Sequence, residues 1–201
     1  LILTFFSLAE TRPKNVNRPR AAELACRMVR DGTLWKNAML VALLNTMLFS
    51  YYSLSPFLFA QLGWSSTAFG WTGFLLAIAS LLGSLLNRRL LTSGLTPERL
   101  VYYACILALL SGVVAWGLQH SAWVLIPVAG VVVAYGIAIP NVLSQALHRY
   151  REQAGVAGAL FGLSYYLLLG ILLGLAGMVQ QLGLVLTVCA LIAWRCSTPR
   201  R

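Results

Sequence analysis

Two apolar stretches of this chain each carry a proline that is flanked, at the same spacing, by side chains able to bind a small molecule through hydrogen bonds. The stretches read "YYSLSPFLFAQ" and "YGIAIPNVLSQ", and their prolines are Pro56 and Pro140. In both, a tyrosine stands five residues before the proline and a glutamine stands five residues after it. A proline inside a helix leaves a backbone carbonyl without its usual donor, which favours polar or watery surroundings. These residues predict binding of a small molecule and no catalysis.

Further polar side chains accompany both prolines. Asn45, Tyr52 and Pro56 fall roughly on one helical face, and so do Asn141 and Gln145. We expect these faces to line a central cavity whose remaining walls are aromatic. For Asn45 and Asn141, hydrogen bonding between packed helices is the alternative. The candidate cavity residues are Asn45, Tyr51, Tyr52, Ser55, Pro56, Trp71, Phe74, Tyr135, Pro140, Asn141, Gln145, Phe161 and Tyr165.

The composition places these residues in lipid. Of 201 residues, 59% are hydrophobic and 10% are charged, and the mean hydropathy is +0.79, which is typical of an integral membrane protein. A net charge of +10 raises the question of nucleic acid binding, but the arginines punctuate apolar runs and form no basic face, so we exclude it. The four cysteines fall in spans or on one predicted side, and we expect no disulfide, no metal site and no cofactor.

Stretches without Asp, Glu, Lys or Arg define the predicted spans. They are Asn37–Asn87, Leu100–His148 and Gln153–Trp194, of 51, 49 and 42 residues. Because one helix needs about 20 residues to cross the hydrocarbon, each stretch holds two crossings and a short turn. The fold predicted is an all-α bundle of six transmembrane helices, at about 36–61, 67–86, 100–117, 122–146, 155–178 and 182–195.

All charged residues fall in the four segments outside those stretches. If each pair of spans returns the chain to its starting side, the segments share one side, which the positive-inside rule assigns to the cytoplasm. We therefore expect both ends of the chain in the cytoplasm and the bundle in a plasma membrane, as in a bacterial inner membrane. The charged segments are Glu10–Lys36, Arg88–Arg99, Arg149–Glu152 and Arg195–Arg201.

The remaining segments complete the predicted organisation. Residues 1–9, "LILTFFSLA", are too short to cross a bilayer and are expected to be the tail of a preceding span in a larger protein. Residues 10–34 are predicted as a cytoplasmic basic linker with a short amphipathic helix over Ala21–Asp31, which lies on the inner leaflet or serves as a tether. The bundle occupies 35–195, and 196–201 form a cytoplasmic tail.

Dividing the six spans three and three places the two proline stretches at matching positions that run in opposite directions, as an inverted repeat requires. The fifth span is rich in glycine. Its pairs Gly158/Gly162 and Gly170/Gly174 have the spacing that allows close approach of helices.

Several segments resemble the second half of a drug exporter of the major facilitator superfamily. They are "LAETRP", "SPFLFAQLGWSSTAFGWTGFLLAIASLLGSLLNRRLL", "GIAIPNVLSQAL" and "AGVAGALFGLSYYLLLGILLG", and the resemblance is nearest to the bicyclomycin-resistance (Bcr/CflA) branch of drug:proton antiporters. The resemblance covers nearly the whole chain. It implies spans seven to twelve of a twelve-span protein, in which two bundles enclose a small-molecule substrate and expose it alternately to each side.

The segment "GSLLNRRLL" is similar to the loop motif of that superfamily, Gly-x-Leu-x-Asp-Arg followed by basic residues. The resemblance implies that Gly83 permits close approach of a neighbouring helix and that Arg88 bonds to groups that differ between two conformations. Asn87 stands in place of the motif's acid, and Glu98 or Glu152 is expected to pair with the arginines. The candidate gating loop is Gly83, Asn87, Arg88 and Arg89.

No Asp, Glu, Lys, Arg or His lies in the middle of a predicted span. Proton relays normally need such residues, so a titrating acid is expected in the N-terminal six-span half. The expected partners are therefore that half, the lipid bilayer, a small-molecule substrate and protons.

The sequence thus favours half of an exporter of small, mainly apolar or amphipathic compounds. A facilitator for sugars or nucleosides is one alternative, and a six-span accessory protein that transports nothing is another. An intramembrane hydrolase built on Ser164 is excluded, because His120 and His148 lie at span ends, away from it. We expect no enzymatic activity.

Overall fold

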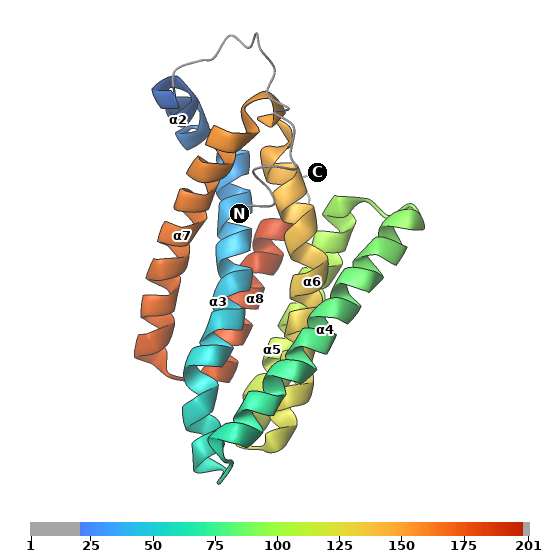
Figure 1. The fold of residues 1–201 in the computed structure, drawn as a ribbon, viewed down its shortest axis with the longest axis vertical. Coiled ribbons are helices and arrows are strands. Elements are labelled where there is room, and N and C mark those ends of the chain that lie inside the picture. The colour runs from blue at the N-terminus through green and yellow to red at the C-terminus, as the bar shows by residue number, and fades with distance from the viewer. Residues whose placement is uncertain (1–20, 199–201) are drawn as a thin grey trace, which may run out of the picture.

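A computed structural model describes residues 21–198. The expected tail of a preceding span at 1–9, residues 10–20 of the expected linker and residues 199–201 of the expected C-terminal tail lie outside the described residues. The described residues form helices joined by short turns (Figure 1). This confirms the all-helical fold class.

The first described helix is α2 (Ala21–Val29). Leu24 and Met28 are each 3% exposed, and α2 packs against α7 (Figure 1). Glu23 and Arg27 are exposed. The sequence predicted a helix to Asp31 that Gly32 would end. That boundary is wrong, because the Asp31 carboxylate accepts hydrogen bonds from the Thr33 and Leu34 amides and so begins the next helix.

Six further helices follow α2 within residues 32–197. Their positions agree with the predicted spans to within four residues at each end, except that the second extends six residues beyond its expected end. They are α3 (Gly32–Gln61), α4 (Ser66–Thr92), α5 (Pro97–Leu118), α6 (Leu125–His148), α7 (Ala154–Val179) and α8 (Leu182–Ser197), with the short helices η1 (Ala122–Val124) before α6 and η2 (Arg151–Gln153) before α7.

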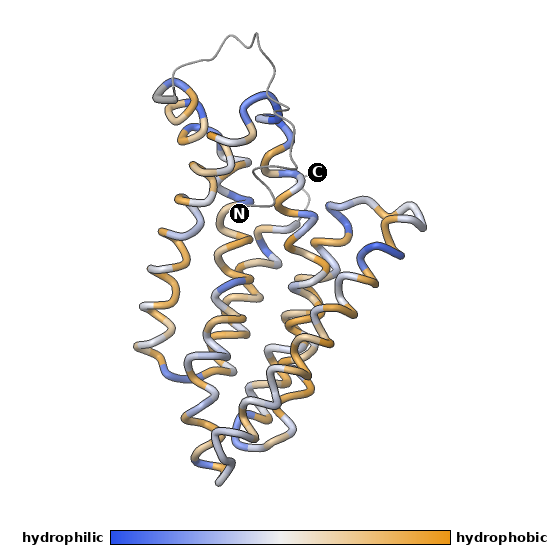
Figure 2. The backbone as a smooth tube through the Cα atoms, viewed as in Figure 1, coloured by the Kyte–Doolittle hydropathy of each residue, from blue (hydrophilic) through white to orange (hydrophobic). Residues whose placement is uncertain are grey.

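Five of the helices are long and apolar enough to cross a membrane. They are α3, α4, α5, α6 with η1, and α7 with η2, whereas α8 is apolar but only 16 residues long. Hydrophilic residues gather at the end of the bundle where α2 and the α6–α7 connection lie (Figure 2). The protein is therefore an integral membrane protein, since so large an apolar surface is stable only in lipid.

The helices differ in how far they are enclosed. Helix α5 packs against α6 and α8, and α3 packs against α6, α7 and α8. Helices α4 and α7 lie on opposite sides of the bundle (Figure 1), where α4 packs mainly on α6 and α7 mainly on α3. In the most apolar 18-residue stretch of each helix, 22% of the stretch in α4 and 17% of that in α7 are buried, against 61% of that in α3. Large faces of α4 and α7 are thus left without a protein neighbour in residues 21–198.

Both prolines lie inside uninterrupted helices, Pro56 in α3 and Pro140 in α6, and both are exposed. Because a proline has no N–H for the carbonyl four residues earlier, the carbonyls concerned are those of Tyr52 and Gly136.

Candidate functional site

The first polar contact between predicted site residues joins α3 to α6. The Tyr135 hydroxyl donates to the Asn45 side-chain oxygen at 3.2 Å, and the Asn45 amide nitrogen donates to the Val41 carbonyl at 2.8 Å. Both ends of the Asn45 amide are therefore engaged within the bundle. This is the interhelical bonding that the sequence left open as the alternative to a cavity.

Tyr51 forms a corresponding contact between α3 and α4. Its hydroxyl donates to the Thr72 hydroxyl at 2.8 Å, which in turn donates to the Phe69 carbonyl at 2.7 Å. Tyr51 is 1% exposed and Ser55 is 0% exposed, so neither lines an open cavity in this structure. A tyrosine or serine in an apolar run has the same sequence signature whether it faces a cavity or a neighbouring helix, so their place in a substrate path stays a prediction.

The closest approach among the predicted site residues is between α4 and α6. A Cβ added to Gly83 would stand 2.5 Å from the Val133 carbonyl oxygen and 3.2 Å from the Gly136 Cα. A Cβ added to Gly136 would stand 2.9 Å from the Ser80 carbonyl oxygen. Each glycine is therefore required for the two backbones to approach so closely.

About one helical turn further along the same contact, Asn87 meets Asn141. The Asn141 amide nitrogen donates to the Asn87 side-chain oxygen at 2.7 Å and to the Ile137 carbonyl at 2.7 Å. Asn87 is 7% exposed and Asn141 is 3% exposed. The structure thus joins a residue of the loop motif to a residue expected in the cavity. We call the contact of Gly83, Asn87, Gly136 and Asn141 the α4–α6 seam.

The predicted gating loop is helical throughout, which corrects the sequence prediction. Helix α4 continues to Thr92 because nothing breaks it before Gly94, whose φ is +90°. Arg88 and Arg89 are exposed on its last turns, where cations favourably meet the negative end of the helix dipole. Within residues 21–198, neither arginine forms an ion pair with Glu98 or Glu152; the ion pair found there joins Arg149 to Asp31.

The remaining aromatic candidates divide between exposed and buried positions. Tyr52 is 45% exposed, Trp71 65% and Phe74 66%, and the rings of Trp71 and Phe74 lie 5.2 Å apart. Phe161 is 2% exposed and its ring lies 5.9 Å from that of the half-buried Tyr165. The exposed rings form apolar surface on α3 and α4.

Gln145 lies apart from these contacts, in a small cavity of about 90 Å³ where α3 and α5 begin and α6 and α8 end. Asn37, Glu98 and Ser197 also line this cavity. The Gln145 amide nitrogen is buried and has no hydrogen-bond acceptor within residues 21–198.

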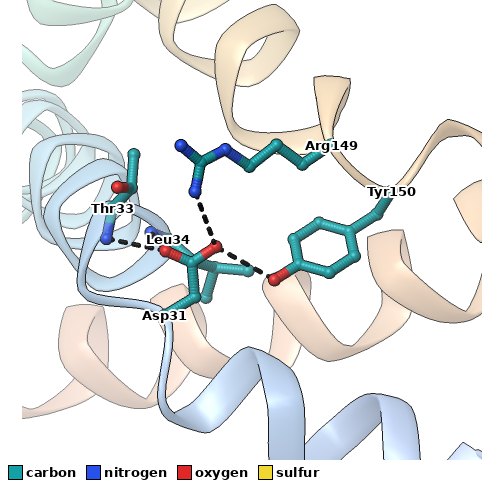
Figure 3. A network of polar contacts seen from close by, with 5 residues as sticks. All are labelled: Asp31, Thr33, Leu34, Arg149 and Tyr150. Atoms are coloured by element: carbon teal, nitrogen blue, oxygen red, sulfur yellow. Dashed lines mark hydrogen bonds and ion pairs between the residues drawn. The ribbon is translucent and has the colours of Figure 1, made fainter.

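A polar network that the sequence did not predict joins the start of α3 to the α6–α7 connection (Figure 3). The Tyr150 hydroxyl donates to the Asp31 carboxylate at 3.0 Å, and an Arg149 guanidinium nitrogen lies 3.9 Å from the same oxygen. An Asp before Gly-Thr is a recognisable helix cap. Its partner Tyr150, however, stands 119 residues away in the chain. The cap was therefore visible in the sequence and the network was not.

The electrostatics of this network favour an ionised Asp31. Partial burial raises the pKa of Asp31, but the hydrogen bonds from Tyr150, Thr33 and Leu34 and the charge of Arg149 outweigh it, so the pKa lies below its ordinary value. Burial and the bond to Asp31 raise the pKa of Tyr150.

We expect Asp31→Asn to change the acid sensitivity of the protein. Because the folded-state pKa of Asp31 is lowered, its charge stabilises the fold above the unfolded pKa of about 3.9, and this contribution is lost as the pH falls through the folded value. Asparagine keeps the helix cap. Thermal unfolding between about pH 6 and pH 3 should therefore fall less steeply for the variant than for the wild type. Parallel curves would show that the network adds no pH-dependent stability.

The sequence of this chain is similar to a known protein family and to two known proteins. The sequence profile of the Major Facilitator Superfamily matches residues 1–186. An "Uncharacterized transporter" of Rickettsia felis (strain ATCC VR-1525 / URRWXCal2) is 25% identical over 156 residues, which are 71% of this chain and 38% of that protein. Another of Rickettsia bellii (strain RML369-C) is 26% identical over 159 residues, 71% of this chain and 39% of that protein. The chain thus spans about two fifths of the length of the curated relatives it matches.

Proposed function

The chain belongs to the major facilitator superfamily, and from that premise we propose that it forms the C-terminal six-span half of an exporter. In this proposal the protein moves small, mainly apolar or amphipathic compounds, drugs among them, by alternating access in exchange for protons. The observation that carries the proposal is the family match together with transporter-named relatives of which this chain covers 38% and 39%.

The unpartnered faces of α4 and α7 support a missing half. An added Cβ at Gly158, Gly162, Gly170 or Gly174 would meet no atom of the described chain within 4 Å. Small residues at this spacing suit close packing of another membrane helix. In the proposal an N-terminal bundle covers these faces, and lipid covers the rest.

The six-span count and the two three-helix inverted repeats belong to the same proposal. Helix α8 rises about 24 Å, less than the hydrocarbon thickness of about 30 Å, but it packs along both α3 and α5. A span enclosed in this way tolerates a short apolar length through local thinning of the bilayer. We place the arginine-bearing end in the cytoplasm of a bacterium, with both chain ends there.

The hydrogen bonds that the polar candidate residues already make support an apolar substrate. Asn45, Asn87 and Asn141 are hydrogen-bonded to other helical residues, which leaves them with little capacity to bind the hydroxyls of a sugar. The exposed candidates are instead aromatic: Tyr52, Trp71 and Phe74. Coupling to protons then requires an acid in the N-terminal half, since α3–α8 carry none at mid-span.

We expect Tyr52→Ala to reduce efflux of Nile red, a neutral apolar dye, from cells that express the full-length protein. The matched control is Tyr103→Ala, because Tyr103 on α5 is 56% exposed and Tyr52 is 45% exposed. Loss of one aromatic contact of about 1 kcal/mol corresponds to roughly a fivefold reduction. An uncoupler that collapses the proton gradient should abolish efflux in the wild type. Efflux that survives the uncoupler would exclude proton antiport, and equal efflux by both variants would exclude Tyr52 from the substrate path.

A further inference from the structure

A second cavity lies at the end of the bundle opposite the arginines, away from the contacts described above. Its volume is about 490 Å³, which lies within the range of sites for small organic ligands. Residues of α3, of the α5–α6 turn and of the α7–α8 turn line it. Three segments far apart in the sequence therefore meet at one opening.

One wall of the cavity is apolar and comes from α3. Leu54, Phe57 and Leu58 follow the spacing of a single helical face. Phe57 is 72% exposed, so its ring is available for contact with a bound apolar body.

Among the described residues, the other walls carry glutamines and one histidine and no Asp, Glu, Lys or Arg. Gln119 and His120 lie 3.4 Å apart, nitrogen to nitrogen. The side chains of Gln61, Gln180 and Gln181 are exposed at the cavity. Each amide offers donors and an acceptor, so the polar side can match a neutral group of either kind.

The turn that presents two of these glutamines is itself strained. Gln180 has φ 53° and ψ 20°, a left-handed conformation that glycine or asparagine usually occupies at a helix end. Gln180 therefore carries a backbone cost that a glycine at this position would not.

We propose that this cavity binds an uncharged amphipathic molecule, whose apolar body lies on α3 and whose hydrogen-bonding edge meets the glutamine amides. The lining within residues 21–198 holds no Asp, Glu, Lys or Arg, which disfavours ions because they would lose hydration without a permanent counter-charge. The role of this cavity as a binding subsite for transported compounds, on the exit side of the membrane, rests on the proposed function.

Equilibrium binding of dansylamide to the purified full-length protein in detergent tests this site separately from transport. The probe is neutral, has an aromatic body and a sulfonamide edge, and changes fluorescence on leaving water. N,N-dimethyl-1-naphthylamine, which shares the body but lacks the sulfonamide, is the matched probe. We expect saturable binding of dansylamide above the micelle background and weaker binding of the naphthylamine.

The variants are Gln61→Leu and Gln180→Gly, with Gln153→Leu at the opposite end of the bundle as control. Glycine relieves the strain at residue 180, so unfolding cannot explain a loss of binding by that variant. Each amide removed should weaken dansylamide binding about fivefold, and the control should leave it unchanged. No saturable binding, or equal binding by all variants, overturns the site. Amide-dependent binding without Nile red efflux would overturn the exporter and leave the site standing.

Discussion

Replacing Gly83 with alanine should destabilise the protein by about 1–3 kcal/mol, because the new methyl group would overlap the backbone of α6. The added Cβ would lie 2.5 Å from the Val133 carbonyl oxygen and 3.1 Å from the Val133 Cα. A flexible side chain could turn away from such a contact, whereas two helix backbones must separate. The free energy of unfolding in detergent measures the effect, and efflux should fall as α4 moves away from α6.

Gly73→Ala is the matched control for that experiment. Gly73 lies in the same helix, and a Cβ there would meet no atom of residues 21–198 within 4 Å. Alanine stabilises a helix relative to glycine by up to about 1 kcal/mol, and this gain in stability is common to both variants. The difference between the variants therefore reports the contact with α6 alone. Equal stabilities would mean that α4 and α6 are not in close contact in the protein.

Replacing Asn141 with leucine should cost about 1–3 kcal/mol of stability, because the buried Asn87 oxygen would lose its donor. The two side chains are joined at 2.7 Å and are 3% and 7% exposed. Leucine offers the Asn87 oxygen no donor in place of the lost amide. Thermal unfolding and efflux should both be affected.

The double variant Asn87→Leu/Asn141→Leu separates the hydrogen bond from other effects of the substitutions. Removing both partners leaves no unsatisfied group from this pair, so the double variant should be more stable than the sum of the single losses predicts, by about 0.5–2 kcal/mol. Strict additivity would mean that the two amides do not interact. Lost efflux with unchanged stability would return Asn141 to the substrate path that the sequence suggested.

The positions of the helices were largely predictable, because a span depends on a local sum of hydropathy over about 20 residues. The end of α3 at Gln61 and the start of α8 at Leu182 lie where the sequence placed them. The errors fall at charged ends: α4 continues through Arg88 and Arg89, and α3 begins at Gly32. Charge marks where a helix leaves the hydrocarbon, but a helix continues until the backbone is broken.

The candidate site was predictable only in part. Asn45, Asn141 and the two tyrosines were recognised as polar positions in apolar helices, but cavity wall and helix contact have the same sequence pattern. The helix face that each residue occupies follows from spacing; what lies opposite that face does not.

The sequence by itself determined that this protein is helical and lies in a membrane, and it marked the apolar spans and the charged end, since hydropathy and charge act along the chain. Only the tertiary structure decided which residues meet. Asn87 and Asn141 stand 54 residues apart in the chain, and Asp31 and Tyr150 stand 119 apart. Their contacts depend on how α3, α4 and α6 pack against one another, and glycines such as Gly83 and Gly136 set how closely two of those helices approach.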